Sequence, residues 1–132
     1  MVTDHRQAHY PAAAPIDAYG NGGFRFAGMS HRGSILCLPD AIEAWEIAHA
    51  TEITRTALAR VLARHGDLDL VVLGTGDRLV VPPPDVREAF SAVGVGLEFM
   101  ATGAAARTYN MLLGEGRRVA AALIAIDRAR AE

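Results

Sequence analysis

Two short loops carry the residues whose types and spacing could bind an anion. Gly74-Thr75-Gly76 follows the apolar run Leu68–Leu73, and Thr102-Gly103 follows the apolar run Val95–Met100. A helix is expected to start at Thr102, and a helix start offers free N–H groups and the positive end of the dipole. Arg107, about one turn along, adds a guanidinium group. The sequence predicts an anion-binding crevice whose candidate residues are Gly74, Thr75, Gly76, Thr102, Gly103 and Arg107.

The same residues also have a structural interpretation. Threonine is a frequent helix cap, so Thr102 could serve only to start the helix. Arg107 could form an ion pair with Glu98 or Asp77. The residue types leave both interpretations open.

No other motif completes a catalytic or metal-binding set. Gly74-Thr75-Gly76 begins like a dinucleotide-binding fingerprint, but the third glycine and the following helix are absent. The segment Gly28–Arg32 departs from a nucleophile elbow because Arg32 stands where glycine is needed. His5 and His9 are four residues apart but lack a third metal ligand. We expect no catalytic residues, metal or cofactor, and favour a protein that is not an enzyme.

Composition excludes several classes of function. The net charge is −2 and aromatic residues make up 6% of the chain, which argues against nucleic-acid binding. All 13 basic residues are arginine, so a P-loop lysine and Schiff-base chemistry are excluded. The single cysteine, Cys37, rules out an internal disulfide and is expected to be buried as a small apolar residue.

The 132 residues are enough for one domain with its own core. We divide them into a flexible N-terminal tail (1–15), a single α/β domain (16–126) and a C-terminal tail (127–132). No apolar run approaches the roughly 20 residues of a membrane-spanning helix. Residues 1–14 resemble neither a signal peptide nor a mitochondrial presequence. We therefore expect a cytoplasmic, bacterial protein that does not span a membrane.

The two loops belong to a predicted βαβ unit. A helix over Asp85–Ala92, introduced by Pro82-Pro83-Pro84, separates the strands Leu68–Leu73 and Val95–Phe99. Strands joined in this way are parallel, so their C-terminal loops meet at the same edge of the sheet, where ligands of α/β proteins usually bind.

Elements outside this unit are less clearly marked. Phe24–Phe26 and Gly33–Leu38 read as the two strands of a hairpin, with Gly28 in its turn. Ile42–Ile47 suits a helix or a strand, and we favour a strand. Thr54 is expected to cap a helix that reaches His65 and stops at Gly66.

The helix from Thr102 to about Glu115 has two distinct faces. Its apolar face contains Ala105, Ala106, Tyr109, Leu112 and Leu113. A second stripe of small and polar residues would let a partner protein approach closely. This candidate partner-binding stripe consists of Gly103, Arg107, Asn110 and Gly114.

Six segments, in order and spacing, match one known family: Ile16–Gly20, Gly23–Phe26, Arg32–Ser34, Leu73–Gly76, Arg107–Leu113 and Glu115–Val119. On these segments the chain resembles the small family of uncharacterised domains that includes mitochondrial respiratory complex I assembly factor 3 and its archaeal and bacterial relatives. The resemblance implies a compact three-layer α/β fold around a mixed sheet, and it favours a strand over a helix for Val119–Ile124. It provides no established catalytic residues that could be carried over to this chain.

Two functions follow as hypotheses. The first is a non-catalytic accessory protein that binds a protein partner, such as a respiratory complex subunit or another assembly factor. The second is a small-molecule (anion) binder or weak enzyme that uses the crevice. Both leave open whether the protein is a homo-oligomer.

Overall fold

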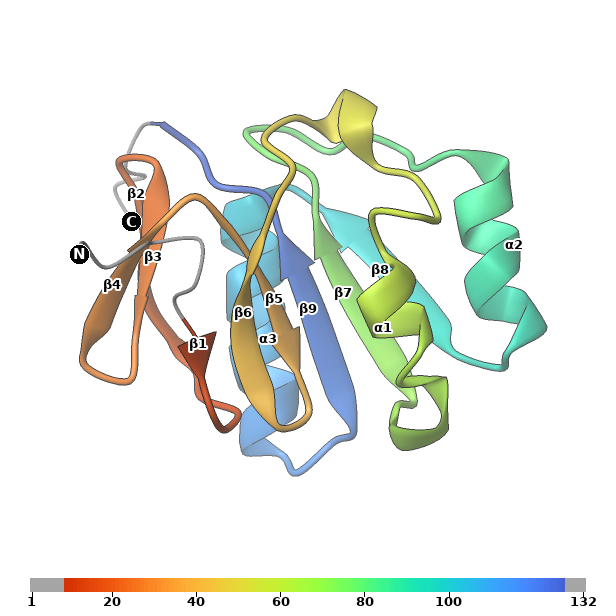
Figure 1. Cartoon of the computed structure of the whole chain (residues 1–132), viewed down its shortest axis with the longest axis horizontal. Coiled ribbons are helices and arrows are strands. Elements are labelled where there is room, and N and C mark those ends of the chain that lie inside the picture. Colours follow the sequence, from red (N-terminus) through yellow and green to blue (C-terminus); the bar gives the residue numbers. More distant parts are fainter. Residues whose placement is uncertain (1–8, 128–132) are drawn as a thin grey trace.

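Six strands form the central sheet of the protein, which the computed structural model describes over residues 9–127. Strands β9, β7 and β8 are parallel to one another, whereas β5 and β6 run antiparallel to their neighbours, so the sheet is mixed. In spatial order (Figure 1) the strands are β1 (His9–Tyr10), β6 (Ala41–Trp45), β5 (Ser34–Leu38), β9 (Val119–Leu123), β7 (Leu70–Gly74) and β8 (Gly96–Met100).

The βαβ unit is confirmed. Strands β7 and β8 pair in parallel, and helix α2 (Pro84–Ala92) connects them. Pro84 begins the helix, because the fixed φ of proline suits the first turn and its missing N–H costs nothing there. The strands predicted at Ile42–Ile47 and Val119–Ile124 are also present, as β6 and β9.

A second, smaller sheet consists of β2 (Ile16–Gly20), β3 (Gly23–Phe26) and β4 (Met29–Arg32). The predicted hairpin between Phe24–Phe26 and Gly33–Leu38 is therefore wrong. Ala27 and Gly28 both have positive φ, 52° and 76°, which closes a two-residue turn and pairs β3 with β4. Gly33, at φ 102°, then redirects the chain into the central sheet as β5.

The helix predicted from Thr54 to His65 is much shorter in the structure. Helix α1 covers only Ala59–Leu62, although the Thr54 hydroxyl accepts a hydrogen bond from the Ala57 N–H at 3.0 Å. Gly66 lies inside the 3₁₀ helix η3 (His65–Asp67). Leu58, the residue before α1, is fully buried in the core, and its backbone (φ −105°, ψ 13°) departs from helical geometry, so the α-helix begins only after it.

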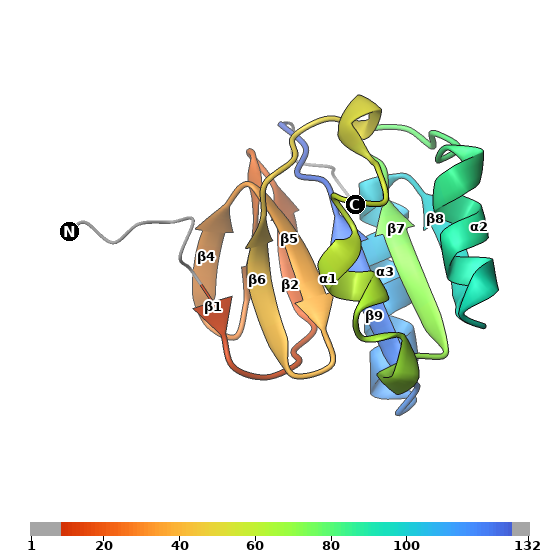
Figure 2. The ribbon, with the colours of Figure 1, turned by 45° about the vertical axis from the view of Figure 1, so that its right-hand side comes forward.

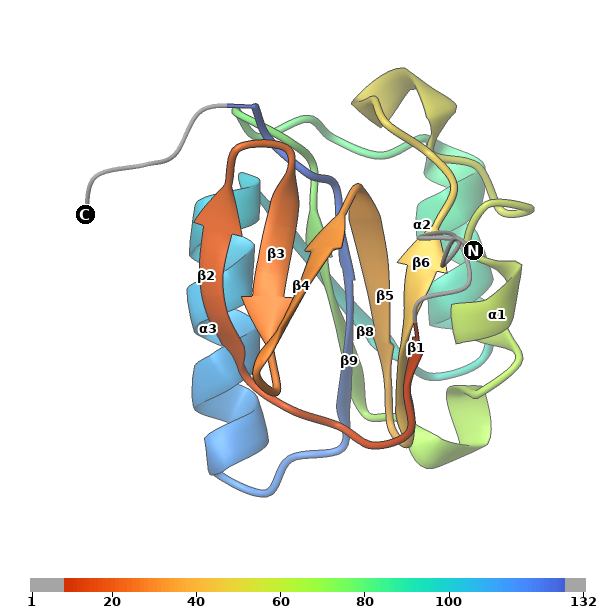
Figure 3. The ribbon, with the colours of Figure 1, turned by 60° about the vertical axis from the view of Figure 1, so that its left-hand side comes forward.

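The elements form three layers around the central sheet, as the family resemblance implies (Figures 2 and 3). Helices α1 and α2 cover one face, with Val61 and Phe90 in its core. Helix α3 (Thr102–Gly114) and the smaller sheet cover the other face, with Tyr109 and Phe24 in its core. No helix within residues 9–127 has the length and apolar character needed to cross a membrane.

The N-terminal boundary of the fold lies earlier than predicted. Residues 9–10 form β1, and Tyr10 pairs with Ile42 of β6 at the end of the sheet. Ala14 is buried as well. The remainder of the two predicted tails, residues 1–8 and 128–132, lies outside the described part of the chain.

Candidate functional site

The structure brings the two predicted loops together at one edge of the sheet. The Thr102 N–H donates to the Gly76 carbonyl at 2.8 Å, and the Gly76 N–H donates to Thr102 Oγ1 at 2.9 Å. The Thr75 N–H donates to the Met100 carbonyl at 2.9 Å. A Cβ on Gly74 would lie 3.0 Å from Thr102 Cα, so only glycine allows this close approach without displacing a neighbour.

Both threonine hydroxyl groups are used inside the fold. Thr102 is fully buried, and its Oγ1 donates to the Ile124 carbonyl at 2.7 Å. Thr75 Oγ1 donates to the Arg78 carbonyl at 2.7 Å and accepts from the Val80 N–H at 3.0 Å. Thr102 does not cap α3, because the N-cap position is occupied by Ala101. Its hydroxyl instead ties together the ends of three parallel strands.

Three of the six crevice candidates border an open hollow of about 350 Å³: Gly76, Gly103 and Arg107. The Arg107 guanidinium donates to the Tyr19 hydroxyl at 3.3 Å and is otherwise exposed. Within residues 9–127 it forms no ion pair with Glu98 or Asp77, the partners considered from the sequence. The hollow therefore presents a cation next to the first turn of α3.

Strand β2 covers half of the candidate partner-binding stripe. Asn110 Oδ1 accepts from the Ile16 N–H at 2.7 Å, and Asn110 Nδ2 donates to the Ile16 carbonyl at 2.8 Å. Gly103 lies against Tyr19, whose hydroxyl oxygen is 2.5 Å from the position of a Cβ on residue 103. Gly103 and Asn110 thus hold the smaller sheet on α3, while Arg107 and Gly114 remain exposed.

A larger hollow of about 850 Å³, which no sequence motif predicted, opens at the same edge of the sheet. Its walls include apolar groups such as Ile47 and Ile126 and charged groups such as Arg32 and Glu46. The segment Leu79–Val81 runs along its border, and Val80 lines it.

This bordering segment is unusually apolar for an exposed loop. Leu79 is 54% exposed and Val81 57%. Three consecutive apolar residues between Arg78 and Pro82 were the signal in the sequence that could have pointed to this region.

Cys37 is buried, as predicted, and offers no chemistry to the site. Burial raises the pKa of its thiol to about 12, although the neighbouring Tyr109 hydroxyl lowers it slightly. Burial also raises the pKa of Tyr109. Both groups stay neutral at physiological pH, so Cys37 is not a nucleophile.

Comparison with protein families identifies close relatives. Residues 16–124 match the model of the family described as "Protein of unknown function (DUF498/DUF598)". An uncharacterized protein of Rhodobacter capsulatus is 42% identical over 119 residues, which cover 90% of each chain. A crystal structure described as an outer membrane protein from Bartonella henselae superposes with a TM-score of 0.85 at 44% identity, over 89% of this chain and 98% of that chain.

A mouse protein has a more informative name, NADH dehydrogenase (ubiquinone) 1 alpha subcomplex assembly factor 3. It is 31% identical over 118 residues. The alignment covers 89% of this chain but only 64% of the mouse protein. This chain therefore corresponds to less than two thirds of the mouse protein's length.

Proposed function

Because this chain belongs to the family of proteins of unknown function DUF498/DUF598, we propose that it is a non-catalytic accessory protein that binds a protein partner during assembly of a respiratory membrane complex. The observation that carries the proposal is the similarity to the mouse assembly factor, which extends over nearly the whole chain. The partner is a subunit of that complex or another assembly factor, and we place the encounter on the cytoplasmic side of the membrane.

Exposed apolar surface supports a protein partner. Leu79, Val80 and Val81 form a continuous apolar run beside the larger hollow, and such runs on a protein surface commonly mark interaction sites. Arg107 and Gly114 on α3 remain candidate contacts, because β2 leaves both exposed. We therefore assign partner binding to the Leu79–Val81 segment and to this exposed part of the stripe.

Deleting the gene is expected to lower the amount of assembled respiratory NADH dehydrogenase in the membrane, measured by native gel electrophoresis and by NADH oxidation. Re-expression of the wild-type chain should restore it. The double variant Leu79→Ser/Val81→Ser and the variant Gly114→Glu should restore it less, because they remove apolar contact area or place a charge on the contact surface.

The matched control is Met29→Ser, which alters an exposed apolar residue (37%) on β4 that belongs to neither surface. It should restore the complex fully. Circular dichroism and thermal unfolding must show that all variants are folded. Normal complex levels in the deletion strain would contradict the proposed function.

The anion-binding alternative is supported by one observation, the position of Arg107 in the smaller hollow beside the first turn of α3. If the hollow binds phosphate or a small carboxylate, Arg107→Ala should weaken binding by about 1.5–3 kcal/mol, the usual range for hydrogen bonds to charged groups. Isothermal titration of both proteins with phosphate and acetate measures this directly. Equal affinities of the two proteins, or no binding by either, would contradict anion binding and leave the hydrogen bond to Tyr19 as the only role of Arg107 supported within residues 9–127.

A further inference from the structure

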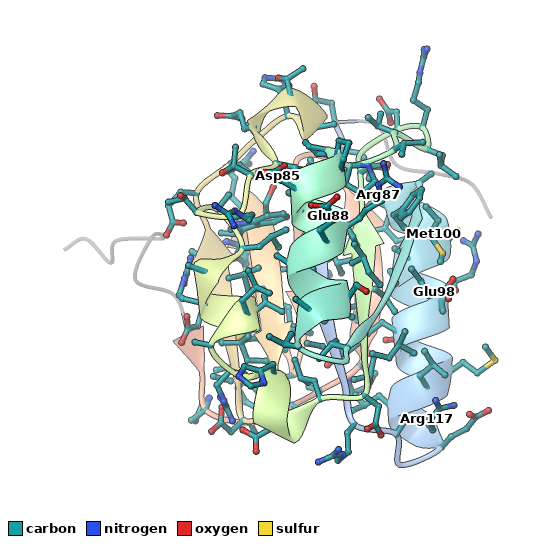
Figure 4. All side chains as sticks on the ribbon, turned by 90° about the vertical axis from the view of Figure 1, so that its right-hand side faces the viewer. Asp85, Arg87, Glu88, Glu98, Met100 and Arg117 are labelled. Atoms are coloured by element: carbon teal, nitrogen blue, oxygen red, sulfur yellow. The ribbon has the colours of Figure 1, made fainter. Side chains whose placement is uncertain are left out.

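Strand β8 leaves one edge of the central sheet open. It is the last strand of the sheet, and within residues 9–127 it pairs only with β7. Figure 4 looks onto this edge, where β8 runs between α2 and α3 and carries Glu98 and Met100 on the side of α3. The opposite end of the sheet is the two-residue strand β1, so β8 is the longer of the two edges.

The hydrogen bonds at the two ends of β8 establish which backbone groups face outward. The Gly96 N–H donates to the Asp69 carbonyl at 3.0 Å, and the Met100 carbonyl accepts from the Thr75 N–H at 2.9 Å. Alternate residues of a parallel strand face the same neighbour, so Gly96, Glu98 and Met100 direct their backbone toward β7. The N–H and C=O groups of Leu97 and Phe99 therefore point away from the sheet. They provide two hydrogen-bond donors and two acceptors with the spacing that a further β-strand needs to pair with β8.

A strand added next to β8 would continue two faces of the sheet, which the side chains of β8 make different from each other. Leu97 and Phe99 are half-buried and pack on the core beneath α1 and α2, which leaves part of their apolar surface uncovered. Glu98 lies on the other face, with Met100, whose sulfur accepts a hydrogen bond from Thr108 of α3. Glu98 is exposed and has no ion-pair partner within residues 9–127.

The position of Glu98 disfavours a second copy of this chain at the edge. An antiparallel copy that uses all four free backbone groups pairs Leu97 with Phe99 of the copy. This register places the two Glu98 side chains directly opposite each other, and like charges in such a pair are destabilising. A strand with a positively charged residue opposite Glu98 would instead be stabilised by the attraction between the two charges.

We propose that the open edge of β8 binds an extended segment of the protein partner, added to the sheet as a seventh strand, with arginine or lysine opposite Glu98 and an apolar residue on each side of it. The apolar residues extend the surface of Leu97 and Phe99, and the free backbone groups of these two residues supply the pairing. This inference rests on the proposed function, since it specifies how the assembly partner is recognised.

The test uses the full chain and a synthetic seven-residue peptide that has a central arginine, a valine on each side and threonines at the ends. A second peptide has glutamate at its centre. Binding is followed by NMR titration at low ionic strength together with amide hydrogen exchange. The arginine peptide is expected to bind about tenfold more tightly than the glutamate peptide, as opposite and like charges at one cross-strand position imply. It should slow exchange at Leu97 and Phe99, whose amides are expected to exchange rapidly in the free protein because they face away from β7.

Charge reversal supplies the control. Glu98→Lys removes no interaction within the described chain, so the variant should fold normally and prefer the glutamate peptide. Glu88→Lys alters an exposed carboxylate on α2 that forms no ion pair with any residue of the 9–127 range. This variant should keep the wild-type preference, which separates strand pairing from general electrostatic attraction. Equal binding of both peptides, protection at other amides, or a dimer protected at Leu97 and Phe99 without peptide would overturn the proposal. The peptide test and the deletion test can fail separately. If Glu98→Lys reverses the peptide preference while the deletion strain has normal NADH dehydrogenase levels, the strand-binding site is supported and only the assembly role is refuted.

Discussion

Val72→Asp is expected to remove most of the folding stability of the protein. Val72 is fully buried at the centre of β7, the strand that pairs with β9 on one side and β8 on the other. An aspartate there would be a buried charge with no partner, which costs about 3–5 kcal/mol in addition to the lost valine contacts. Since a domain of this size is stable by only about 5–15 kcal/mol, most of its stability would be removed.

The measurement is far-UV circular dichroism with thermal unfolding of the purified variant. Val72→Ala is the control, because it removes two methyl groups without adding a charge and should lower stability by roughly 2 kcal/mol while leaving the fold intact. A soluble Val72→Asp protein that is as stable as Val72→Ala would contradict the expected cost of a buried charge in this interior strand.

Thr102→Val is expected to destabilise the protein by about 2–4 kcal/mol, although valine has nearly the same shape. The substitution removes the donor to the Ile124 carbonyl and the acceptor of the Gly76 N–H, and it leaves the first group unpaired in the core and the second unpaired at a half-buried position. Each unsatisfied buried group costs about 1–3 kcal/mol. Chemical denaturation measures the change in free energy of unfolding, and amide exchange at Gly76 should accelerate.

Thr102→Ser separates the hydroxyl from the methyl group. Serine keeps both hydrogen bonds and loses one methyl, so it should cost no more than about 1 kcal/mol. Equal destabilisation by valine and serine would indicate that the hydroxyl group contributes little and that packing alone holds the two loops together.

The two loops show which features of a candidate site local sequence patterns predict and which features depend on distant segments. Parallel strands joined by a helix must end at the same edge, so the proximity of Gly76 and Thr102 followed from local patterns. Whether the Thr102 hydroxyl is free depends on Ile124, which is 22 residues away in the sequence. Once that carbonyl and the Gly76 N–H are in place, the hydroxyl is engaged on both sides.

The same distinction explains the stripe on α3. Its helical spacing correctly placed Gly103, Arg107, Asn110 and Gly114 along one helix. The partner of Asn110 is Ile16, 94 residues away, and no periodicity within α3 encodes that contact. The amide side chain that looked available for another protein therefore binds the edge of the smaller sheet of its own chain.

The sequence by itself determined the elements whose signals are local. Alternating or continuous apolar runs, Pro84 at a helix start and helical spacing after Thr102 were sufficient for β7, α2, β8 and α3. Only the tertiary structure decided that α1 is short, that Asn110 binds β2 and that the Thr102 hydroxyl is engaged by Ile124. The physical reason is that backbone geometry and apolar periodicity act over a few residues, whereas the partner of a buried polar group is chosen by the packing of distant segments.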